Sequence, residues 1–167
     1  MSTLAFKAPT LTTVHHLLSP LGYRKAAALF SRAVEDVIHL IEVQGSRSST
    51  NQEVLFTVNV GVFVPALIYP DVRDVTRPSI PDAHWRERLG FLCPEQKDLW
   101  WKVSSAHEAL DAAEDVAARI QRFALPALAG MGNTNALATV WRTGQSAGLT
   151  EFARKKYLLM LDQNAPP

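Results

Sequence analysis

The clearest pattern in the chain is an alternation of apolar and polar side chains over residues 54–64. Every even position is Val or Phe, whereas the odd positions include Thr57 and Asn59. A period of two built from β-branched and aromatic residues predicts a β-strand with one face in a core. We therefore expect a central strand that places Val58 and Val60 in the main core and turns a polar second face the other way.

Other segments predict strands around this central one. Residues 37–45 also alternate, and the polar turn at 46–52 favours an antiparallel hairpin between them and the central strand. We expect residues 23–33 to form a strand that pairs with 37–45. We also expect a strand at 85–92, and either a short strand or an extended approach to a helix at 98–103.

Helical periodicity appears towards both ends of the chain. A short N-terminal helix is predicted over residues 10–18, because their apolar residues fall on one face and Pro and Gly follow them. A longer helix is predicted over 105–124, because its first Ser and the Glu three residues later can form a capping box. Two further helices are predicted at 135–142 and 150–161.

These elements predict an α+β fold. We expect an antiparallel sheet of about four to five strands in hairpin or meander order, a short N-terminal helix and a C-terminal group of about three helices. The 167 residues are enough for one domain and short for two. We therefore expect a single domain over 1–167, with the N-terminal helix and sheet in 1–103 and the C-terminal helices in 105–163.

Composition and charge narrow the classes of function. The net charge is +1 and the basic residues are scattered, which argues against a nucleic-acid partner. No apolar run reaches the roughly 20 residues that span a bilayer, so we expect no membrane segment. The first 20 residues lack the features of a secretory signal, and Cys93 is the only cysteine. A cytoplasmic protein without disulfides is the expectation.

The connection over residues 65–83 holds four prolines. Prolines at this density exclude a central strand or a helix interior, so the segment is expected to be a long irregular loop. Two interpretations remain open. The loop is a surface excursion, or it is a flap beside a site, since loops often carry function.

The sequence contains no recognisable catalytic motif. It lacks a phosphate-binding glycine loop, a nucleophile elbow and a zinc-binding His-Glu helix. The five histidines lack ligand spacing, and His39 is expected to be a hydrogen-bonded core residue. Cys93 stands between Leu92 and Pro94, which do not activate a thiol. We expect no metal, no cofactor and no enzymatic activity.

The remaining candidate site lies on the polar second face of the predicted sheet. Strand parity places side chains of several strands there, and one of the adjacent tryptophans should face outwards beside them. Two interpretations are open: a cross-strand ladder of charges that is only structural, or a polar floor that binds an anionic or amide-bearing ligand or peptide. The candidate binding residues are Glu42, Gln44, Arg47, Thr57, Asn59, Arg86, Arg88 and Trp100.

Several of these segments carry a resemblance to a known family. The segments are Leu21-Gly-Tyr-Arg-Lys25, Val43-Gln-Gly-Ser-Arg-Ser48, Phe56-Thr-Val-Asn-Val-Gly-Val-Phe-Val-Pro65, Arg86-Glu-Arg-Leu-Gly90 and Asp98-Leu-Trp-Trp101. In order and spacing they resemble a bacterial family known only as domain of unknown function 4304, from about Leu17 to Val103. The family usually has a cysteine where Ala83-His84-Trp85 stand here. The resemblance implies an intracellular α+β domain and supplies no activity or site residue.

Three functions are therefore weighed. The first is a non-enzymatic binding or protein-interaction domain that presents its polar sheet face and proline-rich loop to a protein partner. The second is an enzyme or a small-anion-binding protein that uses Gln44, Asn59, Arg86 and Arg88. The third is a structural role, with a homodimer formed through Phe152, Leu159 and Met160 of the last helix.

Overall fold

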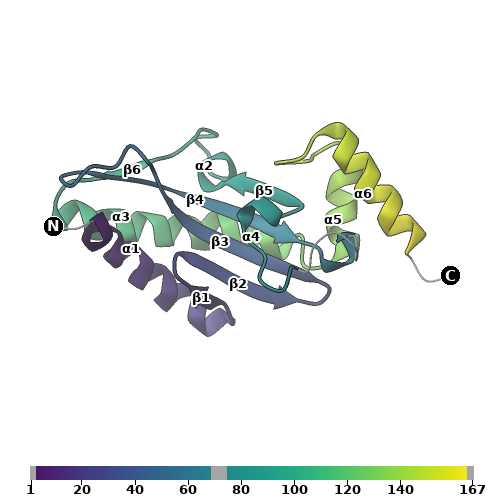
Figure 1. Ribbon diagram of the computed structural model, residues 1–167, viewed down its shortest axis with the longest axis horizontal. Coiled ribbons are helices and arrows are strands. Elements are labelled where there is room, and N and C mark those ends of the chain that lie inside the picture. Colours follow the sequence, from purple (N-terminus) through teal and green to yellow (C-terminus); the bar gives the residue numbers. More distant parts are fainter. Residues whose placement is uncertain (1–2, 69–74, 165–167) are drawn as a thin grey trace.

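The computed structural model describes residues 3–68 and 75–164 of the chain (Figure 1). The described strands form one antiparallel sheet in the order β1-β2-β3-β4-β5, and β6 pairs with β4 as well. β5 and β6 pair with different parts of β4, so this strand is the centre of the sheet. The strands are β1 (Arg24–Ala26), β2 (Leu29–Val34), β3 (Val37–Gly45), β4 (Val54–Phe63), β5 (Trp85–Arg88) and β6 (Trp101–Val103).

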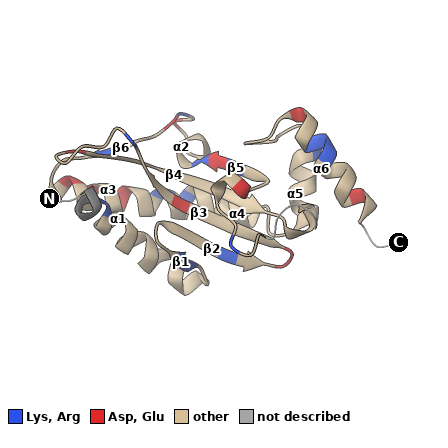
Figure 2. Ribbon diagram, viewed as in Figure 1, with Lys and Arg blue, Asp and Glu red and all other residues tan. Residues whose placement is uncertain are grey.

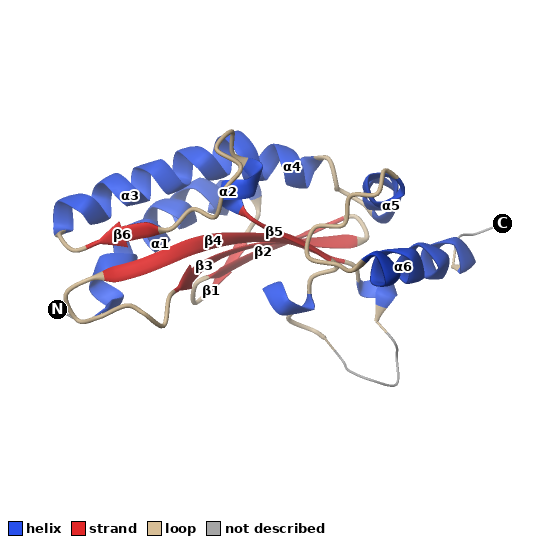
Figure 3. Ribbon diagram, turned by 90° about the horizontal axis from the view of Figure 1, so that it is seen from above, coloured by secondary structure: helices blue, strands red, loops and turns tan. Residues whose placement is uncertain are grey.

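Helices cover one face of this sheet. Figure 3 shows α1, α3 and α4 together on that side, whereas the short turns of the 65–83 connection lie on the other. α3 continues through a π-helical turn at Ile120–Ala124 into α4. The helices are α1 (Thr3–Leu18), α2 (Leu89–Leu92), α3 (Ala106–Arg119), α4 (Leu125–Ala129), α5 (Thr134–Arg142) and α6 (Glu151–Gln163), with 3-10 turns at Ser19–Leu21, Pro65–Leu67 and Ile80–Asp82. The predicted α+β fold with an antiparallel sheet is confirmed.

The main core lies between the sheet and these helices. The even positions of β4, from Val54 to Val62, are fully buried and pack in one cluster with residues of α1 and α3. The predicted core positions of Val58 and Val60 are confirmed, because both side chains have no exposed area. α3 begins as predicted, since the Ser105 hydroxyl accepts a hydrogen bond from the Glu108 backbone N–H at 3.2 Å.

Some predicted boundaries were wrong. Residues 23–33 hold two strands, β1 and β2, joined by a turn in which Ala27 has a φ of 53°. This turn raises the strand count to six, and β2 pairs with β3 as expected. The predicted strand 85–92 ends at Arg88, and α2 follows it. Gly90 allows that turn, because a Cβ there would lie 2.1 Å from the Lys97 carbonyl oxygen.

Two helices contain or adjoin prolines and differ from the predicted bounds. α1 starts at Thr3 rather than residue 10 and contains Pro9. The helix predicted over 105–124 was expected to end before Pro126, because proline disfavours a helix interior. Instead a π-helical turn precedes it and α4 continues. Proline has no N–H to give to the preceding turn, and a π turn is one way to accommodate this loss within a continuous helix.

The second face of the sheet is covered in its middle. Ile80 and Ala83 pack on Leu40 and Phe63 and form a small apolar cluster there. Gly61 lets this cover approach, because a Cβ at Gly61 would lie 3.0 Å from the Ala83 Cβ. The second face is therefore not polar throughout, because an apolar cluster lies across its middle. The end of the 65–83 connection divides that face, and residues 69–74 of it lie outside the described residues.

Candidate functional site

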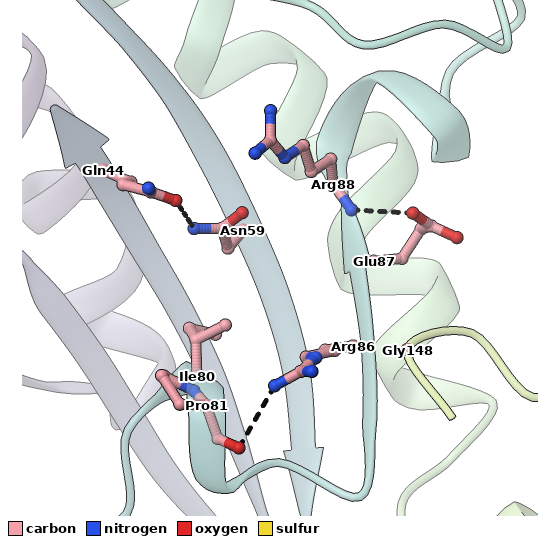
Figure 4. Close-up of a pocket in the computed structure, with 8 residues that line it drawn as sticks. All are labelled: Gln44, Asn59, Ile80, Pro81, Arg86, Glu87, Arg88 and Gly148. Atoms are coloured by element: carbon pink, nitrogen blue, oxygen red, sulfur yellow. Dashed lines mark hydrogen bonds between the residues drawn. The ribbon is translucent and has the colours of Figure 1, made fainter. Parts of the chain in front are cut away.

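An amide–carboxylate cluster on β3 and β4 forms one side of the candidate site. Asn59 pairs with Glu42 across the two strands, and its Nδ2 donates to Glu42 Oε2 at 3.1 Å and to Gln44 Oε1 at 2.6 Å. A carboxylate can only accept, so the contact with Glu42 fixes which way the Asn59 amide points. Figure 4 shows the consequence: Asn59 Nδ2 faces Gln44, and Asn59 Oδ1 points away from it.

Arg86 on β5 is held between two loops. Its backbone N–H donates to the Ala147 carbonyl at 3.1 Å, and its guanidinium Nη1 donates to the Pro81 carbonyl at 3.1 Å (Figure 4). Gly148 lies directly against the stem of this side chain, since a Cβ at Gly148 would be 2.2 Å from Arg86 Cγ. Within residues 3–68 and 75–164, no carboxylate forms an ion pair with Arg86. The guanidinium is therefore positioned but not neutralised.

Arg88 differs from Arg86 because its charge is satisfied within the chain. Arg88 Nη1 donates to both Asp98 carboxylate oxygens, at 2.8 and 2.7 Å, and the guanidinium carbon lies 5.0 Å from the centre of the Trp100 ring. Trp100 Nε1 also donates to Asp98. Burial alone would raise the pKa of Asp98, but these hydrogen bonds and the Arg88 charge hold that pKa below its usual value. Arg88, Asp98 and Trp100 thus form a closed structural group.

These groups surround a pocket of about 300 Å³. We call it the Arg86 pocket. Its chemistry combines an unpaired guanidinium, the Gln44 amide and the Asn59 carbonyl oxygen above a floor formed by β4. Its lining residues are Gln44, Asn59, Ile80, Pro81, Arg86, Glu87, Arg88 and Gly148 (Figure 4).

The predicted candidates take different places around this pocket. The structure brings Gln44, Asn59, Arg86 and Arg88 together in its lining. Glu42 stands behind Asn59, and Trp100 packs on Arg88. The remaining two candidates are not in the lining: Thr57 is buried and donates to the Leu99 carbonyl at 2.7 Å, and Arg47 is exposed in the β3–β4 turn.

The ladder interpretation needs a correction. In that interpretation, one of two left open by the sequence, the arginines of β5 share a face with Glu42 of β3 and form a cross-strand ladder of charges with it. Instead Arg88 pairs with Asp98, and Glu42 accepts from Asn59. The lining residues Pro81 and Gly148 were not predicted. One interpretation of the proline-rich connection, a flap beside a site, is compatible with Pro81 in the lining. Nothing local in the sequence indicates that Gly148 contacts Arg86.

The histidines and Cys93 lie away from this chemistry. His39 Nε2 is 3.0 Å from the Met131 carbonyl oxygen, and burial lowers the pKa of His39 although that contact favours its charged form. The prediction of a hydrogen-bonded core histidine is confirmed. Cys93 is fully buried. The described part of the chain contains no cluster of three or more potential metal ligands, and none of its helices is long and apolar enough to cross a membrane.

Comparison with known proteins identifies a family but no activity. Neither the curated proteins nor the solved structures gave a match to the chain. Residues 14–130 match the family described as a domain of unknown function, DUF4304. This segment is most of the chain and includes the whole sheet from β1 to β6, together with α3. The chain therefore belongs to the DUF4304 family of domains of unknown function.

Proposed function

We propose that this protein is a non-enzymatic binding protein, and that its Arg86 pocket captures a carboxylate of a protein partner. The observation that carries the proposal is the state of Arg86. Its side chain is fixed by Pro81 and Gly148, yet it has no carboxylate partner among the described residues. A guanidinium has five N–H donors, so one bond to a carbonyl leaves a fork that suits a carboxylate.

The neighbouring amides favour a carboxylate that belongs to a peptide. Asn59 uses its Nδ2 on Glu42 and Gln44, which leaves Asn59 Oδ1 as an acceptor. Gln44 uses only its oxygen in that bond, which leaves its N–H groups as donors. An acidic residue in a peptide offers a carboxylate for Arg86, an N–H for Asn59 and a carbonyl for Gln44.

The size and lining of the pocket support binding rather than catalysis. A volume of about 300 Å³ is at the lower end for ligand sites, and it suits one side chain better than a cofactor. Among the described residues, its lining includes no histidine, cysteine, serine or lysine. Glu87 is the one carboxylate there, and it already accepts from the Arg88 backbone N–H at 2.9 Å. We also propose a cytoplasmic location, which suits a lone buried thiol.

The proposal can be tested with an array of short peptides in acidic and amide versions, in which Asp and Glu are replaced by Asn and Gln. We expect the protein to bind acidic peptides and not their amide counterparts. Arg86→Gln should abolish this binding, and Arg86→Lys should weaken it because an ammonium cannot form the fork. Arg47→Gln is the matched control, since Arg47 is exposed and outside the pocket lining. Equal binding by the Arg86→Gln variant would contradict the proposal.

The alternative function, binding of a small anion, uses the same pocket. A competition experiment between a peptide and a small anion distinguishes the two functions. If the protein binds small anions, free succinate should displace a bound peptide at concentrations similar to the Kd of the peptide. If it binds a protein partner, succinate should compete only weakly, because it lacks the N–H and carbonyl groups for Asn59 and Gln44.

A structural role as a homodimer is favoured by a different observation. Phe152 and Leu159, seven residues apart on α6, are 79% and 62% exposed. Seven residues are close to two helical turns, so both side chains lie on one face. Met160 is half-buried against the core and contributes less to that face. Sedimentation of the protein and of its Leu159→Asp variant would show whether this face holds two copies together.

A further inference from the structure

A second, larger pocket lies on the same face of the sheet, on the other side of the 75–83 segment. Its volume is about 740 Å³. Its floor is made by β1 and β2, and one wall is made by Thr76, Arg77 and Pro78. The Arg86 pocket is lined by Ile80 and Pro81 of the same connection. One covering segment therefore separates two pockets that share no lining residue.

The strand register shows which side chains face this second pocket. Arg24 is opposite Ser31, and Ala33 is opposite Ile38. These positions alternate with the buried Phe30, so they point to the second face, where the small side chains of Ser31 and Ala33 leave room. Arg24 stands on this face and Arg77 stands in the wall.

Two more cations lie at the edge of the same pocket. Lys25 and Arg32 also belong to its lining. Their positions along the strands alternate with those on the second face, so their Cβ atoms are on the side of the core. Arg32 is held in place at this edge, because its guanidinium carbon lies 6.0 Å from the centre of the Tyr23 ring. Their charges add to the field of the pocket without lying on its floor.

No described residue neutralises these four cations. Among residues 3–68 and 75–164, the lining of the pocket contains no acidic residue, and none of the four cations forms an ion pair. Several other surface cations are paired, as in Lys102–Glu53, Arg142–Asp162 and Lys155–Glu151. Figure 2 shows blue segments on β1 and β2 and a red one on the neighbouring β3, where Glu42 accepts a hydrogen bond from Asn59. A concave site lined by one sign of charge concentrates ions of the opposite sign.

We propose that this pocket is a binding site for a small organic polyanion that carries phosphate or carboxylate groups. The volume is within the usual range for small-molecule sites, roughly 300–1,000 Å³. Arg24 from the floor and Arg77 from the wall supply charge-assisted donors. The apolar floor, with Leu29 and Ala33, accommodates a carbon skeleton. The site is independent of the Arg86 pocket and does not rest on the function proposed for it.

Isothermal titration of the full chain with inorganic tripolyphosphate and with citrate tests this site. We expect single-site binding that weakens as salt rises from low to physiological concentration, because part of the attraction is screened. Arg24→Gln and Arg77→Gln should each weaken binding by about tenfold, the usual effect of losing a charge-assisted contact. The stronger of the two probes distinguishes a phosphate-bearing ligand from a carboxylate-bearing one.

Two variants with the same change of charge are the controls. Arg47→Gln is outside both pockets, and Arg86→Gln belongs to the other pocket. Both should bind the probes as the wild type does. The proposal is overturned if neither probe binds, if Arg47→Gln weakens binding as much as Arg77→Gln, or if the loss occurs in Arg86→Gln instead. The second result would show general charge attraction, and the third would place the anion in the Arg86 pocket.

Discussion

The two faces of β4 are both buried, but by different means. On the core face, an unbroken stripe of Val and Phe meets α1 and α3. On the second face, Ile80 and Ala83 cover only the middle, and a pocket remains on either side. Thr57 and Asn59 are buried on this face because each makes hydrogen bonds. Apolar packing buries the core face and stabilises the fold. On the second face, hydrogen bonds bury polar side chains, and some of their polar groups stay available to bind a ligand.

The largest effect is expected from a charge on the core face. Val60 has no exposed area, so Val60→Asp would bury an unpaired carboxylate at a cost of several kcal/mol, on the order of the whole folding stability. We expect little soluble protein and no cooperative melt by circular dichroism. Leu110→Asp is the control, since Leu110 is 56% exposed on α3 and should tolerate the change. A Val60→Asp variant that melts like the wild type would show that this face is not the core.

A second prediction concerns His84, which lies on the second face beside the C-terminal end of β4. Its ring contacts the rings of Phe63 and Tyr157. Burial lowers the pKa of His84 to about 4, although Asp82 opposes this shift. The ring is neutral in the folded state and accepts a hydrogen bond from the Val64 N–H. In the unfolded chain, the His84 ring takes up a proton near pH 6.5, whereas in the folded protein it does so only near pH 4. The contribution of the neutral ring to the free energy of unfolding is therefore complete above pH 6.5 and is lost as the pH falls towards 4. The loss should reach roughly 3 kcal/mol.

Urea unfolding at several pH values between 7 and 4 measures this dependence. His84→Asn keeps an acceptor for Val64 and removes the titration, so its stability should fall less steeply over that range. His107→Asn is the control, because His107 is exposed and its ring contacts only Asp111 among the described residues. An unchanged slope in the His84→Asn variant would assign the dependence to other groups.

A smaller loss is expected from Asn59→Asp. This change removes both donors and places a second carboxylate beside Glu42, so we expect a cost of about 1–3 kcal/mol in the free energy of unfolding at neutral pH. Asn51→Asp makes the same change in the exposed β3–β4 turn and should alter stability by roughly 0.5 kcal/mol at most. Equal stability of the two variants would mean that the polar contacts on the second face do not stabilise the fold.

The smallest effect is expected from Arg88→Ala. Arg88 and Asp98 are both partly exposed, so their ion pair should contribute roughly 0–1 kcal/mol. The more sensitive measurement is the pKa of Asp98 by NMR, which should rise when Arg88 is removed. Arg142→Ala, which breaks another exposed pair, should leave the Asp98 pKa unchanged. No rise in the Arg88→Ala variant would show that the pair is not formed in solution.

Parity along the strands predicted much of the sheet and part of the site. Because β3, β4 and β5 are adjacent, alternation alone was enough to place Gln44, Asn59 and Arg86 on one face. The cover by Ile80 could not be predicted, since a proline-rich segment has no periodicity that indicates which face it meets. The turn at Ala27 was missed for a similar reason: a positive φ usually signals glycine, and no glycine stands there.

The part of the chain beyond the family match has a consequence for how such proteins diverge. The match ends at residue 130, yet Trp141 is fully buried in the same cluster as β4, and Ala147 binds the backbone of Arg86. Relatives could therefore keep every matched residue and still differ at the wall that faces Arg86. In this architecture, replacing a C-terminal segment can change the surroundings of Arg86, while the inherited sheet stays the same.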